Sequence, residues 1–201
     1  MRKPKTYEEF ETYASLSIAK GEYKEAIGYL EHCIDLYSGD SDRDLALLWL
    51  RKGSLFTLTE DFETAQTCFD QALQLDENIP DAYLLRAQME SELGNTEAAV
   101  EDLQNYEALA GTQPVIQAAL GGLYESAQDF ENAEKCYTQA ISSENYEVNI
   151  LAARGRCRIL LGDTEGALRD LERYLREGGE DPTGDVHAML GMCRMEAQRY
   201  E

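Results

Sequence analysis

Five alanines recur along this chain at a nearly constant interval, and this period constrains the fold more than any other feature. Ala26, Ala65, Ala99, Ala133 and Ala167 are separated by 39, 34, 34 and 34 residues. A chain with a period of this length is a stack of structural copies, in which each copy buries surface against its neighbours. The period therefore predicts the architecture, whereas it says little about chemistry.

A second set of small residues keeps the same phase. Each member stands 12 residues before one of the alanines, and the set is Ala14, Gly53, Ala87, Gly121 and Gly155. Two small sites at this spacing indicate two helices that touch closely. Between them lie glycine-rich or polar stretches, such as Leu93-Gly94-Asn95 and Thr59-Glu60-Asp61, where one helix can end and the next begin. Each copy is therefore predicted to be a helix, a tight turn and a helix.

The phase predicts five helix pairs and a final single helix. The pairs are 7–20 with 23–37, 44–59 with 62–75, 80–93 with 96–110, 114–127 with 130–143, and 147–161 with 164–177, and the last helix is 184–197. Pro80 and Pro114 fall in the first turn of a first helix, where proline lacks only an amide hydrogen that has no partner anyway. Asp163 and Asn95 precede second helices, where side-chain oxygens favour the free amides.

These features together resemble the tetratricopeptide repeat. The shared pattern is a 34-residue unit with a large residue early in the first helix, a small residue after it, and an alanine followed four residues later by a bulky side chain. The most complete copy contains Trp49, Gly53, Ala65 and Phe69, and the resemblance covers roughly residues 7–201.

The resemblance implies an all-α fold, a right-handed superhelical solenoid of five helical hairpins plus one final helix. It implies a single array over residues 1–201, with repeats at about 7–40, 46–79, 80–113, 114–147 and 148–181 and a terminal helix at 184–197. Tyr106 and Tyr174 replace a residue that is usually small in this family, so we expect altered packing in the third and fifth repeats. Longer joints at residues 38–42 and 178–184 allow a local change of angle.

The charge of the chain limits its partners. With 18 Lys and Arg against 39 Asp and Glu, the formal net charge is −21, which opposes binding to nucleic acid and to anionic membranes. A basic partner and simple solubility both remain open as explanations of the acidity. Neither a membrane-spanning run nor a signal peptide is evident, so a cytoplasmic protein is expected. The five cysteines are scattered singly, which is typical of reduced packing residues.

No pattern in the chain indicates catalysis. The two histidines, His32 and His187, fall in different repeats and lack a base, nucleophile or metal-ligand set around them. The runs of carboxylates do not match a calcium loop, which needs ligands at alternating positions. We therefore expect no enzymatic activity, no cofactor and no metal site.

The resemblance also implies a concave groove lined mainly by first helices, which receives an extended peptide or a partner helix. Nine residues occupy inward-facing family positions and are the predicted groove candidates: Leu50, Ser54, Leu84, Gln88, Ala118, Gly122, Ala152, Arg156 and Met192. The whole set of inward-facing positions, which begins with Glu8 and Glu11, is acidic at the N-terminal end, small and apolar in the middle and rich in methionine at the C-terminal end, so an apolar or mildly basic guest is expected. The methionines could equally cover the next repeat.

Three functions remain open on the sequence. The first is a protein-protein interaction module that binds a segment in its groove. The second is a scaffold that self-associates through the apolar C-terminal helix. The third is a regulatory segment of a longer protein with a catalytic or membrane domain beyond residue 201, because the chain stops where another second helix would begin.

Overall fold

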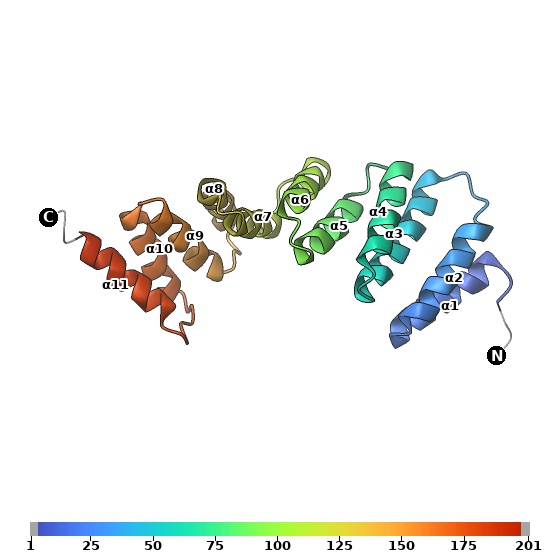
Figure 1. The fold of residues 1–201 in the computed structure, drawn as a ribbon, viewed down its shortest axis with the longest axis horizontal. Coiled ribbons are helices and arrows are strands. Elements are labelled where there is room, and N and C mark those ends of the chain that lie inside the picture. The colour runs from blue at the N-terminus through green and yellow to red at the C-terminus, as the bar shows by residue number, and fades with distance from the viewer. Residues whose placement is uncertain (1–3, 198–201) are drawn as a thin grey trace. The chain divides into compact units, whose positions relative to one another are not determined.

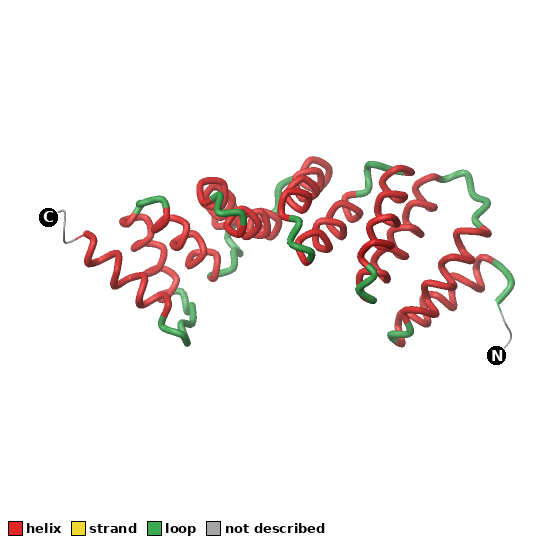
Figure 2. Tube along the Cα trace, in the orientation of Figure 1, coloured by secondary structure: helices red, strands yellow, loops and turns green. Residues whose placement is uncertain are grey.

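The computed structural model describes residues 4–197, and the regular structure in that range is helical throughout (Figures 1 and 2). Its helices are α1 (Tyr7–Lys20), α2 (Tyr23–Leu36), α3 (Asp42–Leu58), α4 (Phe62–Leu75), α5 (Pro80–Glu92), α6 (Thr96–Ala110), α7 (Pro114–Ser126), α8 (Phe130–Ile141), α9 (Asn149–Leu160), α10 (Thr164–Arg176) and α11 (Asp185–Ala197). Every helix end lies within two residues of its predicted position. The all-α prediction is confirmed.

The helices form two compact units. One unit contains α1–α5 with residues 104–109 of α6, and the other contains residues 96–103 of α6 with α7–α11. Within the units, α1 packs on α2, α3 on α4, α7 on α8, and α9 on α10. The single array and its repeat limits stay predictions.

Small residues on first helices admit the bulky side chains of second helices. A Cβ atom on Gly53 would lie 2.7 Å from the ring of Phe69, and one on Gly121 would lie 2.5 Å from the ring of Tyr137. Backbone and ring therefore meet at a distance that only glycine permits without a shift. The five periodic alanines, Ala26, Ala65, Ala99, Ala133 and Ala167, are all fully buried. The periodic small residues of the sequence are thus the places where paired helices contact each other.

The turns between paired helices share one hydrogen-bonding pattern. After α9, Gly162 donates its amide to the Ile159 carbonyl at 3.1 Å, and Asp163 donates to the Arg158 carbonyl at 2.8 Å. This pair of bonds is the Schellman motif, whose left-handed residue is usually glycine. Gly21, Gly94 and Gly162 take that place with φ of 75°, 76° and 81°, whereas Glu60 and Gln128 take it with φ of 61°.

The residue after the left-handed position starts the next helix. Asp61, Asp129 and Asp163 each accept a hydrogen bond from the amide three residues later, at 3.2, 3.2 and 2.9 Å. One aspartate therefore closes the first helix through its own amide and caps the second through its side chain. The predicted capping role of Asp163 is confirmed, and Pro80 and Pro114 begin their helices as predicted.

Hydrophobic cores run through both units. In the first, Leu30 and Phe69 lie at the centres of clusters that also include Tyr7 and Trp49 at their edges. In the second, Leu171 and Tyr174 form part of the cluster between α9, α10 and α11. Cys33, Cys68, Cys157 and Cys193 are buried and unpaired with one another, in keeping with packing roles.

No helix in the described range is both long and apolar enough to cross a lipid bilayer. Residues 198–201, predicted to open a further second helix, lie outside the described residues, as do residues 1–3.

Candidate functional site

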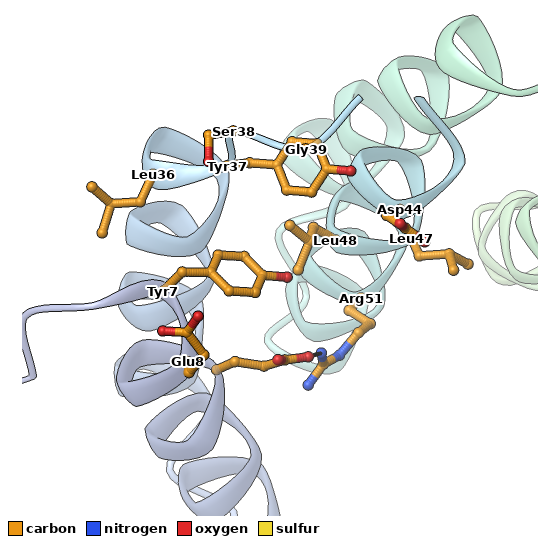
Figure 3. A pocket seen from close by; sticks show the side chains of 11 residues that line it. Tyr7, Glu8, Leu36, Tyr37, Ser38, Gly39, Asp44, Leu47, Leu48 and Arg51 are labelled. Carbon is orange, nitrogen blue, oxygen red and sulfur yellow. Dashed lines mark hydrogen bonds and ion pairs between the residues drawn. The ribbon is translucent and has the colours of Figure 1, made fainter. Parts of the chain in front are cut away.

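A pocket of about 500 Å³ opens in the first unit between α1 and α3, and we name it the N-terminal pocket (Figure 3). Its walls come from α1, from the end of α2 with the loop that follows, and from α3. The lining residues are Tyr7, Glu8, Glu11, Leu36, Tyr37, Ser38, Gly39, Asp44, Leu47, Leu48 and Arg51. The pocket therefore lies where the first two predicted repeats meet.

Aromatic and aliphatic side chains make the interior of the N-terminal pocket. The rings of Tyr7 and Tyr37 lie 6.3 Å apart and extend toward α3, where Leu48 faces them (Figure 3). Leu48 is buried, but Leu36 and Leu47 leave 46% and 38% of their surface exposed. Exposed leucines beside an aromatic wall offer an apolar surface that a ligand side chain can cover.

The loop after α2 holds Tyr37 in place. Its hydroxyl donates a hydrogen bond to the Ser41 carbonyl at 2.8 Å. A Cβ atom on Gly39 would lie 2.6 Å from that hydroxyl oxygen, so any larger residue there would displace the Tyr37 ring. This loop is the insertion that lengthens the first repeat, and it builds a pocket wall as well as a joint.

The rim of the N-terminal pocket is polar and mainly acidic. Glu8, Glu11 and Asp44 face a single cation, Arg51, which lies 3.5 Å from a Glu11 carboxylate oxygen and donates to the Ser15 hydroxyl at 3.3 Å. Burial and the nearby Glu11 carboxylate raise the pKa of Tyr7, so its phenol stays neutral and can donate a hydrogen bond. The rim therefore favours a ligand with positive charge beside its apolar group.

A second pocket, of about 560 Å³, lies in the other unit among α9, the loop before α11, and α11, and we name it the C-terminal pocket. It is lined by Asn149, Ala152, Arg156, Tyr174, Glu180, Asp181, Pro182, Thr183, Asp185, Val186, Ala188, Met189 and Met192. Three predicted groove candidates, Ala152, Arg156 and Met192, therefore come together in one cavity.

Hydrogen bonds fix the walls of the C-terminal pocket. Tyr174 donates its hydroxyl hydrogen to the Glu180 carbonyl at 2.6 Å, and Asp181 accepts the amide of His187 at 3.0 Å. Burial acts to raise the pKa of Asp181, but hydrogen bonds from His187 and from the Val186 amide lower it overall. His187 is exposed and serves this loop, rather than being packed like the large residues at its repeat position.

Arg156 is already paired inside the second unit. Its Nε and Nη2 donate to the Glu125 carboxylate at 3.0 and 3.3 Å, and that carboxylate also accepts the Tyr137 hydroxyl at 2.8 Å. Burial and the Glu125 hydrogen bond raise the pKa of Tyr137. The guanidinium is therefore a positioned polar group at the edge of the C-terminal pocket.

The remaining candidates lie outside both pockets. Leu50 is only 6% exposed and belongs to the core, and Ser54 donates its hydroxyl hydrogen to the Leu50 carbonyl at 2.9 Å. Leu84, Ala118 and Gly122 are half-buried, and Gln88 is exposed. The burial of Leu50 argues against contact with a ligand, whereas the other positions remain accessible.

The repeat pattern predicts only part of the lining of the N-terminal pocket. Glu8, Glu11 and Leu47 stand at inward-facing family positions, but Tyr37 and Gly39 lie in the inserted loop, and loop insertions carry no repeat phase. An unusually long joint beside two tyrosines was the available signal. Within residues 4–197, no group of three or more His, Cys, Asp or Glu side chains has the arrangement of a metal site.

Sequence comparison identifies the repeat. One family model described as tetratricopeptide repeat matches residues 59–114 and 119–184, and a second such model matches residues 14–44. A comparison with curated proteins finds no match.

Solved structures share the fold at low sequence identity. MamA 41-end from Desulfovibrio magneticus RS-1 is 17% identical with a TM-score of 0.73, covering 85% of this chain and 93% of that one. YrrB, described as a TPR protein with an unusual peptide-binding site, is 16% identical with a TM-score of 0.69, covering 95% and 91%. The C-terminal part of a TPR repeat-containing protein from Cytophaga hutchinsonii is 14% identical with a TM-score of 0.73, covering 85% and 67%.

At such identities these structures support the fold and not a shared ligand. The family models, by contrast, match more than half of the residues. The chain belongs to the tetratricopeptide-repeat family.

Proposed function

We propose that this chain is a non-catalytic interaction module that binds an extended segment of a partner protein. The observation that carries the proposal is the N-terminal pocket, whose aromatic wall and exposed leucines are enclosed by an acidic rim. Such a surface fits one apolar side chain with a basic residue beside it in the same segment. The unusual peptide-binding site for which YrrB is described adds support from a protein of the same fold.

The physical reason for a peptide, and not a small molecule, is the shape of the site. The N-terminal pocket is bounded by two first helices and a loop, so a chain can run across it while one side chain enters. The C-terminal pocket repeats this arrangement around Ala152 and Met192, with a thioether side chain that can adapt to its guest. We therefore extend the proposal to the C-terminal pocket as a second docking point.

Peptide selection followed by paired variants tests the proposal. Peptides selected on the whole chain from a random displayed library should be enriched in an apolar residue next to Lys or Arg. Their affinity should fall roughly tenfold or more in the double variant Leu36→Lys, Leu47→Lys, because each lysine places charge on the apolar wall. Fluorescence anisotropy of labelled peptides measures the change.

The chain offers a matched control. Leu58 and Leu93 are 60% and 45% exposed and lie outside the N-terminal pocket, so Leu58→Lys, Leu93→Lys makes the same chemical change elsewhere. Equal loss of affinity in both double variants, or no selected peptide above background, would contradict peptide binding in the N-terminal pocket.

Self-association through α11 is the second candidate function. Met192 and Met195 are 51% and 63% exposed on that helix, which is more than most large apolar side chains of the described range. Sedimentation velocity over a range of concentrations separates the two ideas. A monomer at every concentration removes self-association and leaves the peptide proposal untouched.

A further inference from the structure

An arginine-rich cleft lies in the second unit, away from both pockets. It has a volume of about 410 Å³ and is lined by Arg154, Arg158, Arg169, Asp170, Glu172, Arg173 and Arg176. Helices α9 and α10 together hold six of the chain's 18 basic residues, and none of the six is a lysine. In a chain of net charge −21, this concentration of guanidinium groups stands apart from the rest of the sequence.

The inner arginines of the cleft are held rigidly. Arg154 donates two hydrogen bonds to the Asp170 carboxylate, at 2.8 and 2.7 Å, and Arg158 donates to the same carboxylate at 2.8 Å. Arg158 also binds the Glu134 carboxylate at 2.7 Å. Asp170 is 3% exposed, so these hydrogen bonds form a buried network at the floor of the cleft.

The outer arginines are the ones available to a ligand. Arg169, Arg173 and Arg176 follow one another at intervals of four and three residues, so they share one face of α10. Arg169 lies 3.6 Å from Glu165, but both side chains are well exposed, at 70% and 88%. The Arg176 side chain is exposed and makes no hydrogen bond or ion pair with any residue that the structure describes.

Two neighbouring side chains orient the guanidinium of Arg173, but they do not occupy all of its hydrogen-bond donors. Its guanidinium carbon lies 5.2 Å from the centre of the Tyr146 ring, and its Nε donates to the Glu177 carboxylate at 2.7 Å. Tyr146 also donates its hydroxyl hydrogen to Glu177. The contact with Glu177 is made by Nε, so the Nη side of the planar guanidinium faces away from that carboxylate and can meet an incoming oxyanion.

The acidic groups beside the cleft are themselves paired with arginines. Glu172 is paired with Arg194 at 2.9 Å, Asp170 and Glu134 bind the two inner arginines, and Asp163 lies 3.7 Å from Arg158. Three outer arginines then face two exposed partners, Glu165 and Glu177, and exposed pairs of this kind are weak enough for a ligand carboxylate to replace.

We propose that the cleft between α9 and α10 docks an acidic peptide segment through its side-chain carboxylates. Arginine forks match carboxylates in a bidentate geometry, and the cleft presents several of them along one helix face. A short acidic segment feels mainly these nearby arginines, since charges farther than about 8 Å are screened at physiological salt. A long polyanion such as nucleic acid would also meet the acidic remainder of the chain.

Arg154 and Arg158 lie on a different face of α9 from Arg156, because residues two apart on a helix point in nearly opposite directions. The cleft is thus independent of the C-terminal pocket. One module could hold an apolar segment and an acidic segment at separate places.

Anisotropy with a labelled glutamate-rich peptide tests the proposal. The whole chain should bind a run of glutamates flanked by Gly and Ser at physiological ionic strength, where the distant acidic groups are screened, and the binding should weaken as salt rises further. A peptide with glutamine at every glutamate position should not bind. The double variant Arg169→Gln, Arg176→Gln should weaken binding roughly tenfold.

A charge-matched variant completes the test. Lys24→Gln, Arg43→Gln removes the same charge from exposed positions in the first unit and should leave the affinity within about twofold. The proposal is overturned if the glutamate peptide does not bind, if the glutamine peptide binds equally, or if the two double variants lose affinity to the same extent. Tighter binding of single-stranded oligothymidylate than of the peptide would assign the cleft to nucleic acid instead.

Discussion

The hairpins α3–α4 and α9–α10 occupy equivalent places in the repeat but bury different chemistry. Both use a glycine on the first helix to admit a bulky side chain from the second: Gly53 meets Phe69, and Gly155 meets Leu171. This shared contact sets the distance between the helices. The residues beside the contact are free to differ, and they do.

The position before the bulky residue shows the difference. Cys68 is 1% exposed in one hairpin, and Asp170 is 3% exposed in the other. The carboxylate is tolerated because Arg154 and Arg158 bind it, whereas the position of Arg154 in α3–α4 holds Lys52. The repeat thus accepts either an apolar thiol or an ionised network at the same buried site, provided that the charge has partners.

Removal of the buried carboxylate should have the largest effect. Asp170→Ala leaves two arginines without their shared acceptor and should cost about 3–5 kcal/mol, while Cys68→Ala removes only a small packed group and should cost about 1 kcal/mol. Urea unfolding followed by circular dichroism measures both. Equal losses would show that the network adds nothing beyond packing.

Substitution of three glycines should have the next largest effects on stability, and these effects should differ from one glycine to another. Gly53→Ala places a methyl group 2.7 Å from a Phe69 ring atom and should cost about 1–3 kcal/mol. Gly155→Ala should cost less, because it meets the flexible end of Leu171 at 3.0 Å. Gly28→Ala is the control: nothing lies within 4 Å of its Cβ position, so stability should rise by about 0.5–1 kcal/mol. If all three changes have the same sign, helix contact is not what the glycines provide.

Alkaline pH should weaken the hairpin interior of the second unit. Burial, with a smaller contribution from the Glu125 carboxylate, raises the pKa of Cys157 to about 11. The unfolded thiol loses its proton near pH 8.5 while the folded one keeps it, so the stability is full below that pH and is lost as the pH rises toward 11, by about 3 kcal/mol.

Comparison with Cys157→Ala isolates this contribution. Urea midpoints for the natural chain should fall more steeply between about pH 8 and pH 10 than those for the variant. Parallel slopes would mean that the thiol titrates as freely in the folded chain as in the unfolded one.

The turns should give the smallest effect. Glu60 and Gln128 hold a left-handed conformation that glycine occupies in the other hairpin turns, so Glu60→Gly or Gln128→Gly should stabilise the chain by about 0.5–1 kcal/mol. Gly94→Ala should do the reverse by a similar amount. Thermal unfolding measures the shifts in melting temperature. A lower melting temperature for both glycine variants would show that the left-handed conformation of Glu60 and Gln128 does not strain the backbone.

Local sequence patterns predicted most of the fold, whereas the pockets are formed by residues that lie far apart in the sequence. The spacing of Ala26 and Ala65 and the phase of Gly53 located helices and turns, because each such feature acts within one repeat or its neighbour. The N-terminal pocket needed Tyr7 beside Tyr37 and a loop closed by Gly39, and none of these has a place in the repeat pattern.

The predicted groove residues divide in the same way. Ala152, Arg156 and Met192 share a pocket because α9 and α11 pack close together. Their positions in the family pattern had predicted that all three face the groove. Leu50 stands at an inward-facing position of the pattern but is packed into the core. A one-dimensional pattern gives the face of a helix but not the depth to which a neighbour covers it.

By itself the sequence determined the helices, the turns between them and the small-to-large contacts that join each pair, since all of these depend on the helical period and on residue size. Only the tertiary structure decided which side chains meet across helices: the walls of two pockets, and Asp170 beneath a row of arginines. Those meetings depend on distances between residues far apart in the chain, and such distances follow from packing, not from period.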